Sequence, residues 1–167
     1  MDSRAKLFGH PIHQMLIVFP LGLLGGAIIF DIIHLARGGA WSLLAWYMIG
    51  LGVIMGLLAA VFGLIDWAAI PSGTRAKSVG LWHAIGNVVV LLLFAASWYL
   101  RRREIASPTT LAYVLSFVGF ALSGVTAWLG GELVDRLGVG VHDGANLDAP
   151  SSIGSPSIHT DSARVRV

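Results

Sequence analysis

The sequence of 167 residues contains no cysteine and few charged side chains. The lack of cysteine excludes disulfide bonds, thiolate metal sites and iron–sulfur clusters ligated by this chain. Charged residues make up 12% of the chain, whereas a soluble domain usually contains about 25%. The one basic run, Arg101 to Arg103, directly follows an apolar segment. We therefore interpret it as a membrane stop and predict no nucleic-acid binding.

Long apolar segments take the place of the missing charges. The chain is 56% hydrophobic, and four segments, at about 11–35, 42–70, 79–100 and 110–131, contain few polar residues. Each is long enough to cross a hydrocarbon core of about 30 Å as a helix. Because the connections are short, we predict an all-α, up-down-up-down four-helix transmembrane bundle over residues 1–141, resident in the lipid bilayer. Residues 142–167 are rich in Ser, Gly, Pro and Asp, which predicts a flexible extramembrane tail.

This topology gives the bundle two ends. Side A carries both termini and the turn between the second and third spans, and side B carries the other two turns. Two GxxxG pairs, Gly22/Gly26 and Gly52/Gly56, predict close helix packing within the bundle or in a homo-oligomer. Pro20 lies inside the first span, where it is expected to bend the helix.

The polar residues of the spans gather mainly on side A. Ionisable groups inside a membrane are functional candidates because no water solvates them there. The side A candidates, which the topology predicts to converge, are His10, His13, Asp66, His83, Asn87, Glu132 and Asp135, with His142 just beyond the fourth span. On side B we expect Asp31 to pair with an arginine.

Three interpretations of the side A residues stay open. First, His13 and His83 lie at matched depth on two helices, which suits the two axial positions of a b-type haem. Asn87, Asp66 or Glu132 would then hold the outer ring N–H of a ligating histidine. Second, His10, His13, His83 and Glu132 form a donor set for Zn, Cu or Fe, with Asp66, Asp135 and His142 as supporting polar groups. Third, the same residues serve only to fix helix register. No nucleophile motif or phosphate-binding loop accompanies them, so we predict no catalytic residue.

Several motifs occur in order along the chain: "GHPIHQMLIVFPLGLL", "FGLIDWAAIPSGTRAKSVGLWHAIGN" and "GGELVDRLGVGV". Together they resemble a widespread, largely uncharacterised family of four-span bacterial membrane proteins. Some members look fused to Rieske domains, and the architecture resembles small haem b bundles, which implies redox work. Leu137 departs from the pattern, since the family often has histidine there. The resemblance implies signature positions at His10, Pro11, His13, Pro20, Asp31, Gly63, Asp66, His83, Asn87, Gly130, Gly131 and Glu132.

Together these observations predict a protein of the bacterial cytoplasmic membrane that binds haem b through His13 and His83 and transfers electrons, alone or in a larger redox complex. Two alternatives are an accessory subunit that binds nothing itself and a protein that binds a transition-metal ion. Five basic residues near side A and four near side B leave the membrane orientation undecided.

Overall fold

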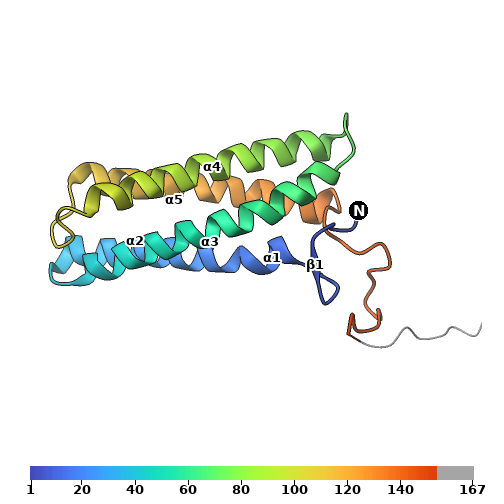
Figure 1. Ribbon diagram of the computed structural model, residues 1–167, viewed down its shortest axis with the longest axis horizontal. Helices are drawn as coiled ribbons and strands as arrows, with labels where there is room; N and C mark the ends of the chain where they lie inside the picture. Colours follow the sequence, from blue (N-terminus) through green and yellow to red (C-terminus); the bar gives the residue numbers. More distant parts are fainter. Residues whose placement is uncertain (154–167) are drawn as a thin grey trace, which may run out of the picture.

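The computed structural model describes residues 1–153, and most of these residues are helical (Figure 1). The helices are α1 (Ile12–Leu16), α2 (Val18–Arg37), α3 (Trp41–Ala69), α4 (Arg75–Arg101) and α5 (Thr110–Gly131), with the π-helix η1 (Glu132–Arg136) continuing α5. The two-residue strands β1 (Lys6–Leu7) and β2 (His10–Pro11) pair just before α1. This architecture confirms the predicted all-α class. Residues 154–167 of the predicted tail lie outside the described residues.

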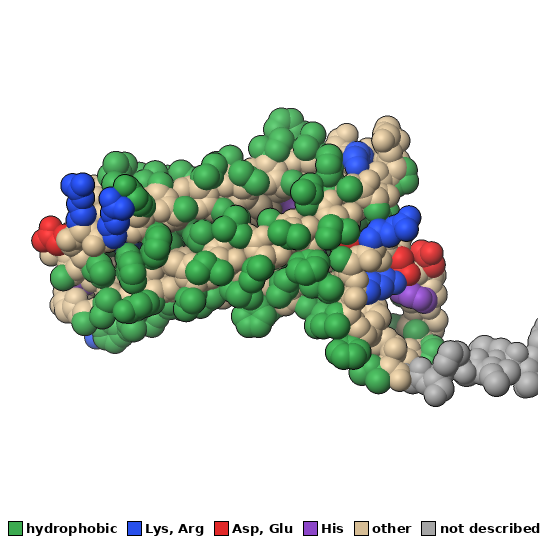
Figure 2. Space-filling model, in the orientation of Figure 1, with side chains coloured by type: hydrophobic (Ala, Val, Ile, Leu, Met, Phe, Trp, Pro, Cys, Tyr) green, Lys and Arg blue, Asp and Glu red, His purple; other side chains and the backbone are tan. Residues whose placement is uncertain are grey.

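The helices form the four predicted spans. The stretches Ile12–Arg37, Trp41–Ala69, Arg75–Arg101 and Thr110–Arg136 are long and apolar enough to cross a membrane. They alternate in direction, and the N-terminus lies at the same end of the bundle as the end of η1, which is side A (Figure 1). Hydrophobic side chains cover the flank of the bundle, and charged side chains gather at its two ends (Figure 2). The chain is therefore a multi-pass membrane protein.

The helix of the first span is interrupted between Leu16 and Val18, one turn before Pro20. Proline has no N–H to bond the carbonyl four residues earlier, and its ring crowds that carbonyl. The residue four before Pro20 is Leu16, where α1 ends, and α2 begins at Val18. The expected disturbance thus separates a short helix that carries His13 from the rest of the span.

The four spans are organised as two helical hairpins. The first hairpin comprises α1, α2 and α3, and the second comprises α4, α5 and η1. Leu24, Ala27 and Ile28 of α2 are buried with Ala45 and Ile49 of α3, and this cluster continues across the hairpin boundary to Val90 and Phe94 of α4. The core therefore runs along the axis that the two hairpins share.

Three of the four glycines in the two GxxxG motifs pack closely against a neighbouring helix, as predicted. A methyl group added at Gly26, Gly52 or Gly56 would collide with Met48, Leu24 or Leu91 respectively. Gly22 is different, because no atom lies within 4 Å of the position that its Cβ would take. Close approach of helices in lipid depends on such small residues.

A fully buried ion pair joins the hairpins near side B. Asp31 of α2 and Arg101 of α4 each have a side-chain exposure of 0%. The guanidinium donates from Nη1 to Oδ1 at 2.6 Å and from Nη2 to Oδ2 at 2.7 Å, which is the bidentate geometry. Arg101 also donates to the hydroxyls of Ser97 and Ser116, both at 3.1 Å. The predicted pairing of Asp31 with an arginine is confirmed.

Breaking this pair should destabilise the bundle strongly. Either Asp31→Ala or Arg101→Ala leaves an uncompensated buried charge, which costs about 3–5 kcal/mol in the free energy of unfolding. The double variant Asp31→Leu/Arg101→Met removes both charges and should recover most of that loss. Tryptophan fluorescence during denaturant titration in detergent micelles measures the effect. Arg37→Ala, at the exposed end of α2, is the control, and single variants as stable as this control would contradict the prediction.

Candidate histidine site

His13 is held inside the first hairpin by a backbone carbonyl. Its Nδ1 lies 2.8 Å from the carbonyl oxygen of Ala59 on α3. One turn further along α3, Gly63 leaves room for the ring, since a Cβ there would lie 2.8 Å from His13 Cε1. The ring can therefore take this position only because residue 63 has no side chain.

His83 has the same arrangement in the second hairpin. Its Nδ1 lies 2.9 Å from the carbonyl oxygen of Thr126 on α5. Gly130, again four residues after the carbonyl, faces the ring, and a Cβ there would lie 3.0 Å from His83 Cε1. The Thr126 hydroxyl donates to Asn87 Oδ1 at 3.1 Å, so α4 and α5 are also joined beside the ring.

The two imidazole rings lie next to each other across the hairpin boundary, with nearly perpendicular planes. Their centroids are 6.4 Å apart and their planes are inclined by 86°. The expectation that His13 and His83 share one depth is therefore met. Two imidazoles on opposite sides of one metal ion, each with a metal–nitrogen bond of about 2 Å, have centroids about 6 Å apart. The observed centroid distance is close to that value.

The carbonyl partners decide which ring nitrogen carries the hydrogen. A carbonyl oxygen only accepts hydrogen bonds, so Nδ1 of each histidine must be the protonated donor. In a neutral ring this leaves Nε2 with a free lone pair. Among the described residues, none donates a hydrogen bond to Nε2 of His13. The Asn87 amide nitrogen lies 3.3 Å from Nε2 and 3.5 Å from Nδ1 of His83, at nearly the same distance from both.

Asn87 is the remaining predicted residue that joins this pair. Its amide donates to the carbonyl of His83 at 2.9 Å, one turn earlier in α4. The proposed role of Asn87, Asp66 or Glu132 as the partner of the outer ring nitrogen is instead filled by the carbonyls of Ala59 and Thr126.

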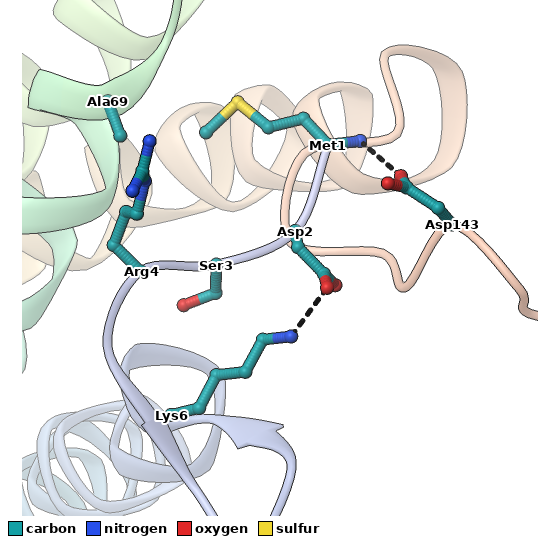
Figure 3. Close-up of a pocket in the computed structure, with 7 residues that line it drawn as sticks. All are labelled: Met1, Asp2, Ser3, Arg4, Lys6, Ala69 and Asp143. Atoms are coloured by element: carbon teal, nitrogen blue, oxygen red, sulfur yellow. Dashed lines mark ion pairs between the residues drawn. The ribbon is translucent and has the colours of Figure 1, made fainter.

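Asp66 binds the N-terminal segment and not the histidines. Its Oδ1 accepts from the backbone N–H of Arg4 at 2.7 Å and of Ala5 at 3.2 Å, and the Ser3 hydroxyl lies 2.8 Å from both carboxylate oxygens. The segment then runs beside a hollow of about 460 Å³, where Lys6 pairs with Asp2 (Figure 3). The hydrogen bond from Lys6 holds the pKa of Asp2 below its ordinary value.

The other predicted side A residues have separate partners. Glu132 forms a salt bridge with Arg75 between η1 and the start of α4. Asp135 is 86% exposed and lies near Arg136. His10 Nε2 is 3.1 Å from the hydroxyl of Ser152, and His142 Nδ1 accepts from the N–H of Gly144 at 3.0 Å. Within residues 1–153, no group of three or more His, Asp or Glu side chains is placed to share a metal ion. The four-residue donor set is thus not assembled here.

The matching surroundings of the two histidines extend along both hairpins. Leu24 follows His13 by 11 residues and contacts the Cβ position of Gly52, and Phe94 follows His83 by 11 residues and contacts that of Gly119. On the partner helices, Gly63 follows Gly52 by 11 residues and Gly130 follows Gly119 by 11.

The ion pair fits the same correspondence. Asp31 follows His13 by 18 residues, and Arg101 follows His83 by 18. Both hairpins start on side A and return to it. These spacings indicate an approximate twofold relation between the hairpins about the bundle axis, as in membrane proteins built of parallel repeats. The helix break after α1 occurs only in the first hairpin, and η1 occurs only in the second. The histidine pair and the ion pair both join equivalent positions across this axis.

A known family covers most of these elements. The family described as predicted membrane protein (DUF2231) matches residues 9–143. The chain belongs to the DUF2231 family. No curated protein and no solved structure matches it. The matched region of this DUF2231 protein begins before His10 and ends after η1, so it contains both histidines, both glycines that face them, and the ion pair.

The residues that sequence reasoning missed are Ala59, Thr126 and the packing role of Gly130. Backbone carbonyls are invisible to motif analysis because every residue has one. A signal was nevertheless present, since the spacings of 11 and 18 residues recur in both halves of the chain.

Adding a methyl group beside either ring should displace it. For Gly63→Ala and Gly130→Ala we expect a loss of about 1–3 kcal/mol in the free energy of unfolding, because a hydrogen-bonded ring cannot move without strain. Gly124→Ala on α5 is the matched control, since nothing lies within 4 Å of its Cβ position; it should be neutral or stabilise by up to about 1 kcal/mol. Thermal unfolding in detergent checks this, and equal stability of all three variants would refute it.

Removing the Asp66 carboxylate should release the N-terminal segment. Asp66→Ala loses hydrogen bonds to a charged acceptor, each of which contributes about 1.5–3 kcal/mol, so we expect trypsin cleavage after Arg4 and Lys6 to become at least about tenfold faster. Asp135→Ala, which removes an exposed carboxylate on the same side, is the control. Unchanged cleavage in Asp66→Ala would show that other contacts hold the segment.

Proposed function

We propose that this protein binds a b-type haem between its two hairpins, with His13 and His83 as axial ligands, and transfers electrons in the cytoplasmic membrane of a bacterium. The observation that carries the proposal is the histidine pair itself: one ring from each hairpin, at a centroid distance of 6.4 Å, with each Nδ1 bonded to a carbonyl. Bound haem would supply one-electron exchange, and the axial ligands are a main determinant of its potential.

The hydrogen bonding of both rings supports ligation. Metal-binding histidines almost always donate their second ring N–H to a carbonyl or carboxylate, which fixes the tautomer and raises the basicity of the ligating nitrogen. The carbonyls of Ala59 and Thr126 provide this for His13 and His83. With Nδ1 as the donor, Nε2 is the nitrogen of each neutral ring that has a lone pair for a ligand.

The number of protein donors favours haem over a bare metal ion. A zinc ion in a protein takes three or four protein ligands, whereas haem iron already has four porphyrin nitrogens and needs at most two. The described residues bring two histidines together, and Glu132 and His10 are engaged elsewhere. Two protein ligands suffice for haem and are fewer than the three or four that a zinc ion takes.

The surroundings of the pair also suit an apolar cofactor. His13 and His83 are half-buried on the boundary between the hairpins, within two of the apolar spans and near side A. Haem-binding bundles build their sites in this way, from side chains on facing helices. An electron-transfer partner would then reach the site from side A, alone or as part of a larger membrane complex.

The visible spectrum of protein purified from cells supplied with a haem precursor tests this function. We expect a Soret band and a reduced-minus-oxidised spectrum of the b type, both lost in His13→Ala and in His83→Ala. His10→Ala and His34→Ala remove histidines that lie at the two ends of the bundle, away from the pair, and should keep the full spectrum. The expected loss is at least about tenfold in bound haem, as for ligand-shell changes in other metal sites.

Two other results would overturn the haem proposal. A colourless protein that contains stoichiometric zinc, copper or iron, lost in both ligand variants, would establish the metal-ion alternative. A colourless and metal-free protein that purifies with fixed partners would instead favour an accessory subunit in which the histidines fix helix register.

A further inference from the structure

The three consecutive arginines at the end of α4 have different environments. Arg101 points into the bundle toward Ser97, four residues earlier, and is completely buried in the ion pair. Arg102, the residue after α4, takes no part in that network, and its guanidinium carbon lies 3.6 Å from the ring centroid of Tyr99. Only Arg102 and Arg103 are exposed, so the basic run presents two charges at the side B surface.

These two arginines border a hollow of about 480 Å³ at the α4–α5 turn. Tyr99 and Leu100 of α4 line it together with the side chains of Ser107 and Thr109 from the turn. The Thr109 oxygen accepts from the N–H of Ala112 at 3.3 Å, which leaves its O–H free to donate. The hollow therefore contains guanidinium and hydroxyl donors next to an aromatic side chain.

The hollow has an excess of positive charge. Glu104 also lines it, but neither Arg102 nor Arg103 forms a salt bridge with any carboxylate of residues 1–153. Basic side chains gather over this end of the bundle in Figure 2. Two positive groups and one negative group leave the site suited to an anion.

Its position also identifies the kind of anion. The turn joins two membrane spans, and Tyr99 and Leu111 on either side of it are 55% and 56% exposed on the lipid-facing surface. Tyrosine is enriched at the level of the lipid headgroups, where its ring is in the apolar layer and its hydroxyl in water. A ligand in this hollow would lie at the headgroup level.

We propose that this hollow binds the headgroup of one anionic phospholipid. The arginines would hold the phosphate, since a guanidinium matches phosphate oxygens in a bidentate manner. Ser107 and Thr109 would donate to the remaining oxygens, and the acyl chains would lie along the exposed apolar surface of α4 and α5. This site is independent of the histidine pair at the other end of the bundle.

Native mass spectrometry of the detergent-solubilised protein, mixed with phosphatidylglycerol and phosphatidylcholine, tests the proposal. We expect one phosphatidylglycerol retained per chain in preference to phosphatidylcholine. The double variant Arg102→Gln/Arg103→Gln should bind phosphatidylglycerol roughly 30-fold more weakly, because each arginine near an anionic lipid contributes about fivefold. Arg101 remains in this variant, so the ion pair and the helical content measured by circular dichroism should be unchanged.

The control is Arg37→Gln, which removes the other exposed arginine of side B and should retain the lipid. Equal loss in this control would show unspecific surface charge and overturn the proposal. Equal retention of the two lipids would overturn it as well. Complete displacement of the lipid by millimolar inorganic phosphate would show that the hollow takes free anions and not a lipid.

Discussion

The buried pair of Asp31 and Arg101 is the constraint on which the bundle depends. Two charges inside an apolar bundle are tolerated only when each finds the other with good geometry and their remaining donors are satisfied. Because Asp31 belongs to the first hairpin and Arg101 to the second, this happens only when the hairpins dock in one register. The hydroxyls of Ser97 and Ser116 complete the network. A shift by one helical turn would leave both charges unpaired, so the pair selects a single docked arrangement.

That register determines the height at which the two histidines meet. Each is 18 residues before its partner in the ion pair, on the same span, so matching Asp31 with Arg101 also matches His13 with His83. Within each hairpin, a glycine lets the ring reach a carbonyl of the neighbouring helix. The site is therefore positioned by helices throughout, which holds its rings more precisely than loops would. The helix break before Pro20 makes α1 a separate short helix, and this helix carries His13.

The sequence was informative where the governing signal is local. Hydropathy and length defined the spans, and the short turns placed the N-terminus and the end of the fourth span on side A. The alternation of direction then brought His13 and His83 to one depth and left an arginine as the partner of Asp31. Asp66 and Glu132 were also expected to lie close to the histidines, but both lie near helix ends and contact other groups. There they reach the N-terminal segment and Arg75, and the placement of such segments is not encoded in periodicity or hydropathy. The carbonyl partners of the histidines were not predicted because every residue has a backbone carbonyl.

The two ends of the axis differ in one chemical respect that bears on function. At side B the equivalent positions hold opposite charges, which satisfy each other completely. At side A both imidazoles have a backbone carbonyl as the partner of Nδ1, so the lone pair of a neutral ring lies on Nε2 in each. Two acceptor nitrogens cannot hydrogen bond to each other. A third component that accepts electron pairs from both sides would complete the arrangement. A proton, a water molecule or a metal centre would each meet that requirement, and the haem iron proposed above would be one such centre.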